Sequence, residues 1–341
     1  MRPDEEVALY EHHLIVVDEG QSPVRIDKYL AQRLTHLSRS RIQLAIDTGL
    51  VTVDGIAVRP STKVRPGQSI QVRLPYPPPT DLAPEPIPLE IVYEDAYLLV
   101  VNKPAQMSCH PGAGVYSGTL LNALLYHVQD TVLPSSEQNM ARPGLVHRID
   151  KDTTGLLVVA KEERTYYGLA QQFFEHTALR RYWALVWGSP EQDGGTIIAH
   201  IARDPYDRKK YRAYPDGSQG KHAITHWRVV ERLPLATWIE CQLETGRTHQ
   251  IRVHLSHLGY PLVGDKTYGG DRPRIPLISA RWSQEAHRLL QKMPRQALHA
   301  YLLGFHHPIT GENLCFEAPL PTDMREAIEY LRELARSVSS L

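Results

Sequence analysis

The chain has 341 residues, and 42% of them are hydrophobic, which is enough to bury a core in each of two domains. The 38 Lys and Arg residues balance 38 Asp and Glu residues, so the total charge offers no general attraction to nucleic acid or a membrane surface. The apolar runs are all shorter than the ~18 residues of a membrane helix, and the three cysteines form no CxxC pair, which argues against a disulfide framework or a cysteine-rich zinc site.

The first residues, "MRPDEEVALYEHH", lack the basic start and the apolar core of a signal peptide. Widely spaced cysteines fit a reducing compartment. We therefore expect a soluble protein located in the cytoplasm.

Residues 22–74 are predicted to form a small α/β domain. Apolar residues recur at helical spacing in residues 25–34. A second helix is predicted over residues 38–49, with a serine available as N-cap and Gly49 as its stop. The pair Asp54-Gly55 predicts a tight hairpin turn, and a further strand follows it.

Residues 25–41 carry five basic residues against one acidic residue, Asp27. The basic residues are Arg25, Lys28, Arg33, Arg39 and Arg41. Arg39 and Arg41 flank the start of the second helix, where side chains and free backbone amides can meet phosphates together. This arrangement favours an RNA-binding face, and a solvated helix surface is the alternative.

Residues 75–90 are predicted to be a linker. Seven of the 14 residues from Pro75 to Pro88 are proline, which cannot continue a helix or a central strand. Such a segment favours extended polyproline geometry and acts as a semi-rigid spacer.

Residues 91–335 are dominated by short segments rich in β-branched and aromatic residues. The predicted strands lie in residues 97–104, 156–161, 181–188, 223–233 and 237–245, and the predicted helices in residues 117–128, 165–176, 248–259 and 324–337. Several strands follow one another without helices between them, which predicts a mixed, mostly antiparallel sheet and an α+β domain.

Charged residues crowd into "HRIDKD", immediately before a predicted buried strand that follows Gly155. A carboxylate such as Asp150 in a loop that leads into a core strand is held rigidly enough to act as a nucleophile or general base. The alternative is that Asp150 or Asp152 only bonds backbone amides in the turn.

Two other enzyme classes fit this cluster poorly. In a protein kinase the aspartate follows His-Arg directly, but here Ile149 intervenes, and the chain has no DFG motif and no glycine-rich phosphate loop. A metal hydrolase would need clustered histidines, yet His249 and His254 would lie on different faces of a helix. Structural or surface roles are therefore favoured for these histidines.

A second candidate segment is "LETGRTHQIRVHLSHLGYPLVGDKTYGG". Its Arg247 follows Gly246 at a predicted strand-to-helix junction, so this arginine and Asp150 could pair across a pocket and keep the carboxylate ionised. In "RRYWALVWG", Tyr182 begins a strand and has a polar tip; ordinary core packing is the alternative for it.

Together, "HRIDKDTTGLLVVAK", "RRYWALV", the segment around Arg247 and "QALHAYLLGFHHPITGE" resemble the RluA-type pseudouridine synthases. "SRSRIQLAIDTGLVTVDGIAV" resembles the core of the S4-like RNA-binding module. The layout and "GTLLNALLYH" look most like the RluD-type members, which act on large-subunit ribosomal RNA. One departure is Ile149, where the family more often has Leu, a volume-conserving exchange.

The resemblance implies isomerisation of uridine to pseudouridine, with no cofactor and no metal. By position in the motifs, Asp150 matches the essential aspartate, Arg247 the arginine paired with it, and Tyr182 the aromatic residue that stacks on the target base. Arg148 would enter the RNA stack and fill the space of flipped nucleotides.

The implied partner is ribosomal RNA, in the assembling large subunit, and the implied enzyme is a monomer. Because the total charge is zero, RNA binding would depend on local basic segments such as "RDPYDRKKYR", which contains Arg208, Lys209 and Lys210. A non-catalytic RNA-binding or ribosome-assembly protein on the same fold is the competing interpretation. It would have no need of Asp150, Tyr182 and Arg247 together.

Overall fold

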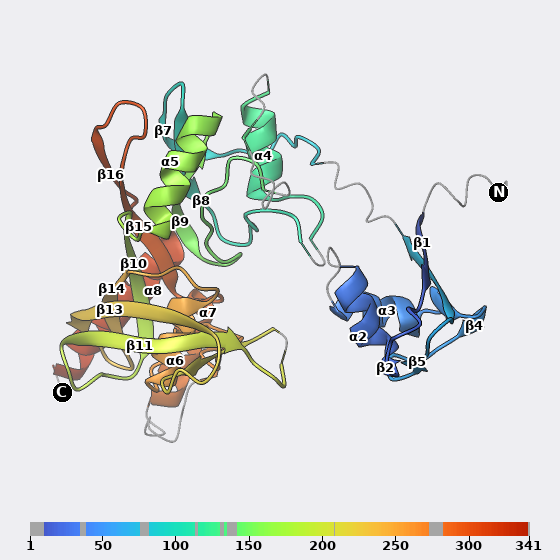
Figure 1. Ribbon diagram of the computed structural model, residues 1–341. Helices are drawn as coiled ribbons and strands as arrows, with labels where there is room; N and C mark the ends of the chain where they lie inside the picture. The colour runs from blue at the N-terminus through green and yellow to red at the C-terminus, as the bar shows by residue number, and fades with distance from the viewer. Residues whose placement is uncertain are drawn as a thin grey trace. The chain divides into compact units, whose positions relative to one another are not determined.

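The structure is a computed structural model, and it describes residues 10–34, 39–75, 82–112, 115–129, 133–134, 142–207, 209–272 and 282–339. The chain divides into two compact units, Met1–Asp81 and Leu82–Leu341, each with its own hydrophobic core (Figure 1).

The N-terminal unit packs two helices against a small antiparallel sheet. The helices are α2 (Ile26–Arg33) and α3 (Arg39–Asp47), and the strands are β1 (Tyr10–Val16), β3 (Val51–Val53), β4 (Ile56–Ala57) and β6 (Ser69–Pro75), in the order β1-β6-β3-β4. A second, two-residue pair joins β2 (Val24–Arg25) to β5 (Lys63–Val64). The predicted hairpin is confirmed, because Asp54 and Gly55 have φ angles of 51° and 80° between the paired strands β3 and β4.

A buried carboxylate joins the two helices of this unit. Asp27 is fully buried and accepts hydrogen bonds from Arg25, Arg39 and Gln43. Burial alone would raise the pKa of Asp27, but these donors outweigh burial and hold the pKa far below its usual range. Asp27 therefore ties the start of α3 to α2.

The larger unit is built on a ten-stranded sheet in the order β12-β11-β13-β14-β10-β15-β9-β8-β7, with β16 paired to β15. The strands are β7 (Glu90–Glu94), β8 (Leu98–Lys103), β9 (Thr154–Ala160), β10 (Leu179–Trp187), β11 (Gly194–Arg203), β12 (Tyr211–Tyr214), β13 (Lys221–Arg232), β14 (Ala236–Leu243), β15 (Leu298–His306) and β16 (Asn313–Glu317). Among the described strand pairs of this sheet, β9 with β15 is parallel and the others are antiparallel. The prediction of an α+β fold with a mixed, mostly antiparallel sheet is confirmed.

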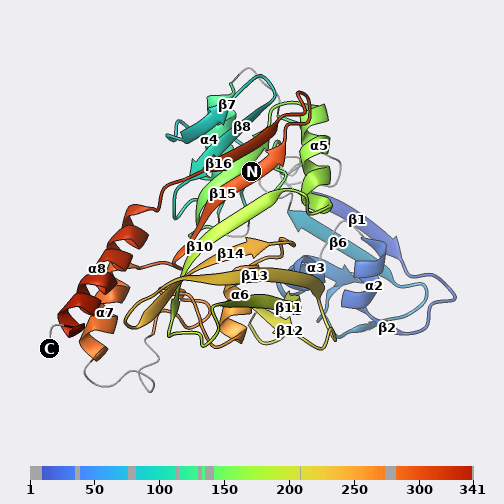
Figure 2. The ribbon, with the colours of Figure 1, turned by 90° about the vertical axis from the view of Figure 1, so that its left-hand side faces the viewer.

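Helices cover both faces of this sheet. They are α4 (Leu120–His127), α5 (Glu163–Phe174), α6 (Gln250–His257), α7 (Ser283–Lys292) and α8 (Thr322–Ser339). Apolar residues of α4 and α6 share one core with the inner face of β8, β9, β10 and β14. On the other face, α5 packs on β8 and β9, while α7 and α8 lie side by side and pack on β10 (Figure 2). Within the described ranges, no helix is both long and apolar enough to cross a bilayer.

Candidate active site

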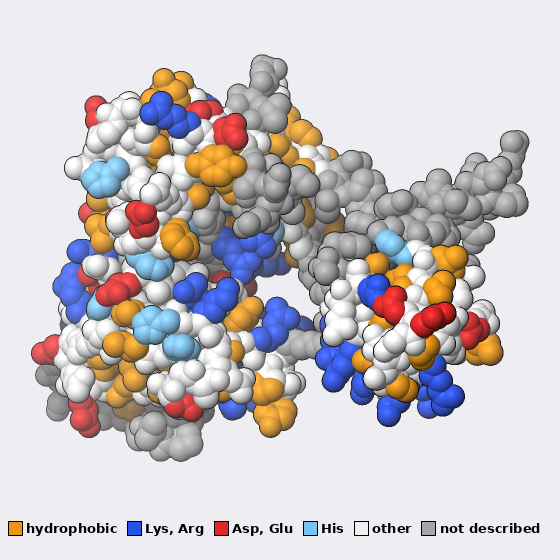
Figure 3. All heavy atoms as spheres, in the orientation of Figure 1, with side chains coloured by type: hydrophobic (Ala, Val, Ile, Leu, Met, Phe, Trp, Pro, Cys, Tyr) orange, Lys and Arg blue, Asp and Glu red, His pale blue; other side chains and the backbone are white. Residues whose placement is uncertain are grey.

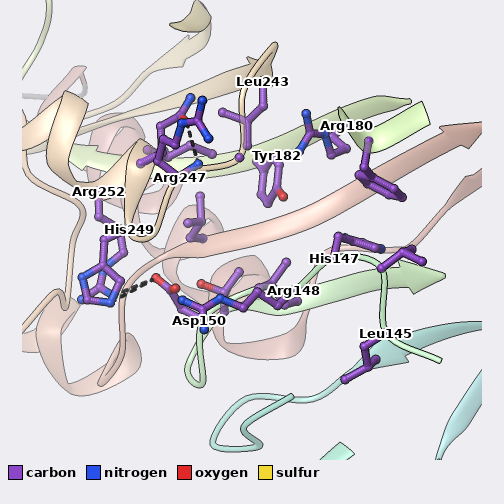
Figure 4. A pocket seen from close by; sticks show the side chains of 18 of the residues that line it. Leu145, His147, Arg148, Asp150, Arg180, Tyr182, Leu243, Arg247, His249 and Arg252 are labelled. Atoms are coloured by element: carbon purple, nitrogen blue, oxygen red, sulfur yellow. Dashed lines mark hydrogen bonds and ion pairs between the residues drawn. The ribbon is translucent and has the colours of Figure 1, made fainter. Parts of the chain in front are cut away.

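A pocket of about 500 Å³ opens on the sheet face that α4 and α6 cover. Residues from the loop before β9, the start of β10, the end of β14, the start of α6 and the end of α5 line it (Figure 4). The predicted residues Arg148, Asp150, Tyr182 and Arg247 all lie in this lining, although they come from segments far apart in the sequence. The pocket is strongly cationic, because Asp150 is the one carboxylate among its lining residues, all of which the structure describes.

Two buried cations, Lys103 and Arg295, donate hydrogen bonds to backbone carbonyls of the loop that carries Asp150. The ammonium of Lys103, which is fully buried, donates hydrogen bonds to the carbonyls of Pro104, Met107 and Lys151. Burial lowers the pKa of Lys103 to about 8. Arg295 donates to the carbonyl of Asp152 at 2.9 Å. These bonds hold the backbone of Lys151 and Asp152, the two residues that directly follow Asp150.

Arg295 is in turn held by α8. Its guanidinium makes two hydrogen bonds to the carboxylate of Asp323, at 2.7 and 2.8 Å, and Asp323 lies in the first turn of α8. The last helix therefore supports the loop of the candidate active site.

The carboxylate of Asp150 pairs with Arg252. The distance from Nη1 of Arg252 to Oδ2 of Asp150 is 2.8 Å, and two further N–H groups of the same guanidinium bond the buried Asp265 at 2.7 and 2.9 Å. Burial alone would lower the pKa of Arg252, but the hydrogen bonds to Asp265 and the charge of Asp150 raise it. Asp150 is therefore held beside a permanent positive charge, with one side turned to the pocket.

The prediction that Asp150 pairs with Arg247 is therefore wrong, because its partner is Arg252. No hydrogen bond or ion pair joins these two residues, both of which the structure describes. Instead, the Nε of Arg247 donates to the carbonyl of His222 at 2.9 Å, and its backbone N–H donates to Oε1 of Gln250. Arg247 still lines the pocket, from the segment between β14 and α6.

Gln250 explains why the chain turns at this place. The amide oxygen of Gln250 accepts from Thr245 and from the backbone of Arg247, and its NH₂ donates to the carbonyl of Ile224. His249, just before the helix, has a left-handed φ of 57°. The turn places Arg252 in the first turn of α6 and directs it inward.

His249 also faces the aspartate. Its Nε2 lies 3.9 Å from Oδ2 of Asp150, and its Nδ1 shares a hydrogen bond of 2.8 Å with the hydroxyl of Tyr268. Burial lowers the pKa of His249, with Asp150 opposing that shift. A neutral imidazole therefore stands beside the carboxylate.

Tyr182 projects from β10 into the pocket (Figure 4). Its side chain is buried, and burial raises the pKa of the phenol, so the hydroxyl is protonated. The ring belongs to the same core as Ile149 and Leu243, so core packing and exposure to the pocket are both true of it. It offers a flat apolar face with a polar tip inside the pocket.

The two residues before Ile149 have different surroundings. Arg148 is exposed, and its Nη2 donates to the hydroxyl of Thr248 at 3.0 Å. His147 stacks on Phe173 and accepts a hydrogen bond from the backbone of Val158. Burial, and then the charge of Arg180, lower the pKa of His147 to about 3. Arg148 is free to meet a ligand, whereas His147 is a neutral structural residue.

The other predicted RNA contacts have varied positions. Arg33 and Arg39 are exposed in the N-terminal unit, but Arg33 pairs with Asp18 and Arg39 with the buried Asp27. Lys209 is exposed, and Lys210 lies 3.8 Å from Asp207. The side chain of Arg41 and the whole of Arg208 lie outside the described residues. Lys and Arg side chains gather along the lower side of the N-terminal unit in Figure 3.

Sequence reasoning missed Arg252, Asp265 and Gln250, although all three lie in the segment that contains Arg247. The signal available was the spacing after Gly246: the first arginine is in the turn, and the second is on the helix that follows. Asp265 lies in a loop and carries no local pattern of its own. Contacts between two loops and a helix decide which arginine reaches Asp150.

Comparison with known proteins identifies both units. Residues 97–257 match the family described as RNA pseudouridylate synthase, and residues 24–70 match the S4 domain. An uncharacterized RNA pseudouridine synthase, YlyB, of Bacillus subtilis is 46% identical over 94% of this chain and 98% of its own length. The ribosomal large subunit pseudouridine synthase D of Zymomonas mobilis is 48% identical over 90% of this chain and 93% of its own.

A solved structure shares the fold. Human RNA pseudouridylate synthase domain containing 4 superimposes with a TM-score of 0.53 over 71% of this chain and 93% of its own, at 24% sequence identity. The S4 domain and the match to the RNA pseudouridylate synthase family define an enzyme that acts on RNA. The chain belongs to the RNA pseudouridylate synthase family, and it is therefore an isomerase.

Proposed function

We propose that this enzyme isomerises specific uridines to pseudouridine in large-subunit (23S) ribosomal RNA, with Asp150 as the catalytic aspartate. The ion pair between Asp150 and Arg252 at the pocket is the observation that carries the proposal. Relatives named ribosomal large subunit pseudouridine synthase D, at 48% and 45% identity over about nine-tenths of this chain, support the choice of RNA. The enzyme acts as a monomer in the cytoplasm, on the assembling large subunit.

The reaction detaches the base from C1′ of the ribose, turns it, and rejoins it through C5. Asp150 either attacks C1′ or C6 as a nucleophile or removes a ribose proton to give a glycal. In each route Asp150 acts through a carboxylate oxygen, and Arg252 donates a charge-assisted hydrogen bond that holds this group at the pocket. The bonds broken and formed balance within the nucleotide, so the reaction calls for no cofactor.

The neighbouring residues position the nucleotide. Tyr182 stacks on the target base, and its protonated hydroxyl is available for a hydrogen bond. Arg148, exposed at the pocket, fills the place that the flipped nucleotide leaves in the RNA stack. Arg247 lines the pocket and is partly exposed, so it can contact the RNA there. The N-terminal S4 domain and the exposed Lys209 hold RNA by its phosphates.

The test is to map pseudouridines in ribosomal RNA of cells that lack the gene and carry a plasmid copy of the wild type, Asp150→Asn or Asp152→Asn. Asp152 lies in the same loop but is not among the residues that line the pocket, so it is the matched control. We expect defined pseudouridines to disappear without the gene, to stay absent with Asp150→Asn, and to return with the wild type and Asp152→Asn. Normal conversion by Asp150→Asn would refute the assignment of the catalytic residue.

A further inference from the structure

Arg180 is a buried cation for which the described residues provide no anion. Its side chain lines the pocket, and the residue is only 7% exposed. Its Nη2 donates to the carbonyl of Glu244 at 3.0 Å, but its buried Nε has no hydrogen-bond partner among the described residues. No described carboxylate lies within ion-pair distance of its guanidinium, and burial lowers its pKa.

Among the described residues of the larger unit, the other two buried arginines are both neutralised. Arg252 contacts Asp150 and Asp265, and Arg295 contacts Asp323. Removing an ion from water is costly unless an opposite charge lies nearby. Arg180 therefore differs from these arginines in a way that calls for a ligand with negative charge.

The surroundings of Arg180 hold the guanidinium in place without neutralising it. One face of the guanidinium lies 5.5 Å from the centre of the Phe173 ring. On another side is Gly246, where an added Cβ would lie 2.8 Å from Nη1, so a larger residue would displace the arginine. The Phe173 ring also stacks on His147, which stays neutral. The position is thus built for a cation that keeps its charge.

The location indicates which anion is meant. Arg180 and Tyr182 are two residues apart on β10 and both are buried, so their side chains project from the same face of the strand. Their attachment points are about 7 Å apart by the rise of a β-strand. A base stacked on Tyr182 brings its sugar and the adjoining phosphates along that face. A uracil is neutral and would leave the charge of Arg180 uncompensated, whereas a phosphodiester would not.

We propose that Arg180 binds the phosphodiester group next to the uridine that is turned into the pocket. This inference rests on the proposed function. Arg180 is then a positioning residue: it fixes the backbone of the flipped nucleotide so that C1′ is presented to Asp150. The same charge selects for an extruded nucleotide, since a phosphate reaches this depth only when the nucleotide leaves its helix.

The experiment uses the full chain and an RNA fragment that contains one uridine found by the mapping described above. The variants are Arg180→Gln, which keeps a donor for Glu244 but removes the charge, and Arg180→Lys, which keeps the charge. The matched control is Arg181→Gln, because Arg181 is the next residue on β10 and bonds Gln242 on the opposite face. Binding is measured over a range of salt concentrations, together with the melting temperature of the free protein.

We expect Arg180→Gln to weaken RNA binding about tenfold and to reduce the slope of log affinity against log salt by about 0.7, the value for one phosphate contact on a single strand. Arg180→Lys retains most of the slope. Since Arg180 is uncompensated in the free protein, Arg180→Gln leaves the melting temperature equal or higher. A lower melting temperature with an unchanged slope would show a purely structural role and overturn the proposal.

A second arm uses the same RNA with a neutral methylphosphonate on one side or the other of the target uridine. At the contacted position, wild type and Arg180→Gln should bind alike, so that the two changes are not additive. Full additivity at both positions would overturn the proposal. If the wild type fails to convert the unmodified RNA, the proposed function fails; if the wild type converts it and Arg180→Gln matches Arg181→Gln, only the present inference fails.

Discussion

Arg252 touches two carboxylates in different ways, and the difference sets what each can do. Asp265 takes two N–H groups of the guanidinium and is itself buried and further bonded by the backbone N–H groups of Thr267 and Tyr268. Asp150 takes a single N–H and keeps a face toward the pocket. Asp265 therefore orients the arginine, and Asp150 is left with lone pairs for a substrate.

Replacing Arg252 by Lys tests this division. An ammonium cannot bridge two carboxylates in the planar fork of a guanidinium, so Asp150 would lose its fixed partner. We expect Arg252→Lys to slow single-turnover conversion at saturating RNA about 100-fold, or about 2.7 kcal/mol in the barrier. Arg247→Lys is the matched control, and its rate should fall by less than about tenfold. An equal loss of rate in the two variants would contradict the assignment of Arg252, and not Arg247, as the partner of Asp150.

His254 in the middle of α6 makes the stability of the larger unit depend on pH. It is fully buried, its Nδ1 meets the hydroxyl of Thr225, and its Nε2 has no partner in the described part of the chain. Burial, and then the nearby His257, lower its pKa to about 4. In the unfolded chain the pKa returns to about 6.5, so the unfolded state takes up the proton first as the pH falls.

The stabilisation from a neutral His254 is therefore complete above pH 6.5 and is lost as the pH falls toward 4. Replacing His254 by Asn removes this titration while keeping a polar group near Thr225. Between pH 7 and pH 4.5, the free energy of unfolding of the wild type should fall by roughly 2 kcal/mol more than that of the variant. Urea unfolding at both pH values measures the difference, and parallel pH profiles would contradict the assignment.

At the scale of elements, the parallel contact of β9 with β15 brings the loop of Asp150 to the middle of the sheet. Thr154 pairs with His299, and Gly155 with Ala300. Gly155 has a φ of +119°, and an added Cβ would lie 2.2 Å from the carbonyl oxygen of Ala300. Only glycine lets the two strands approach this closely directly after the loop of Asp150.

Gly155→Ala should therefore separate β9 from β15 and destabilise the larger unit by more than about 3 kcal/mol, measured by urea unfolding. Activity should fall with it, because Asp150 lies five residues away along the same path. Gly112→Ala is the control, since a Cβ there meets nothing within 4 Å. A Gly155→Ala protein as stable as this control would show that the strands can part without cost.

The elements that sequence patterns predicted are those with local signals. The hairpin at Asp54-Gly55, the amphipathic α8 and the buried strand β9 each follow from spacing or turn chemistry. The first eight residues of β15 are all buried, so polar and apolar residues do not alternate there as in a half-buried strand. The sequence pattern therefore does not predict this strand. In β1, Leu14 and Val16 are exposed, which hides the strand. The helix α7 and strand β11 were not predicted.

The site was predictable in its residues but not in its contacts. Asp150 and Tyr182 are indicated by their position before or at the start of a strand, and Arg148 by the resemblance to the RluA-type enzymes; the structure gathers all three in one pocket. The choice between Arg247 and Arg252 depends on how Gln250 turns the chain into α6, which no local spacing reports. Arg180 was overlooked for a related reason, because the lack of an anion is a property of the folded neighbourhood.

At the scale of the whole molecule, the two units have separate cores and unequal sizes. Residues such as Ile26, Leu30 and Ile70 form the core of the N-terminal unit. Leu82 and Ile87, in the segment that follows it, pack on the core of the larger unit. A small core stabilises its unit by less, because a short chain buries a smaller fraction of its surface.

We therefore expect two calorimetric transitions in the full chain, the N-terminal unit unfolding first. Asp27→Asn should lower only the first midpoint, because it leaves Arg25 and Arg39 without their carboxylate partner. Asp265→Asn is the counterpart in the larger unit, and it should lower only the second midpoint. A single transition that both variants shift alike would mean that the units unfold together.

The support of the Asp150 loop through Arg295 and Asp323 also has a consequence for synthesis on the ribosome. Every residue that lines the pocket precedes α8 in the chain, yet the loop receives its last support from the first turn of that helix. A nascent chain that ends before α8 has all the pocket residues but not this brace. We expect the enzyme to begin modifying RNA only after its final helix has emerged and folded.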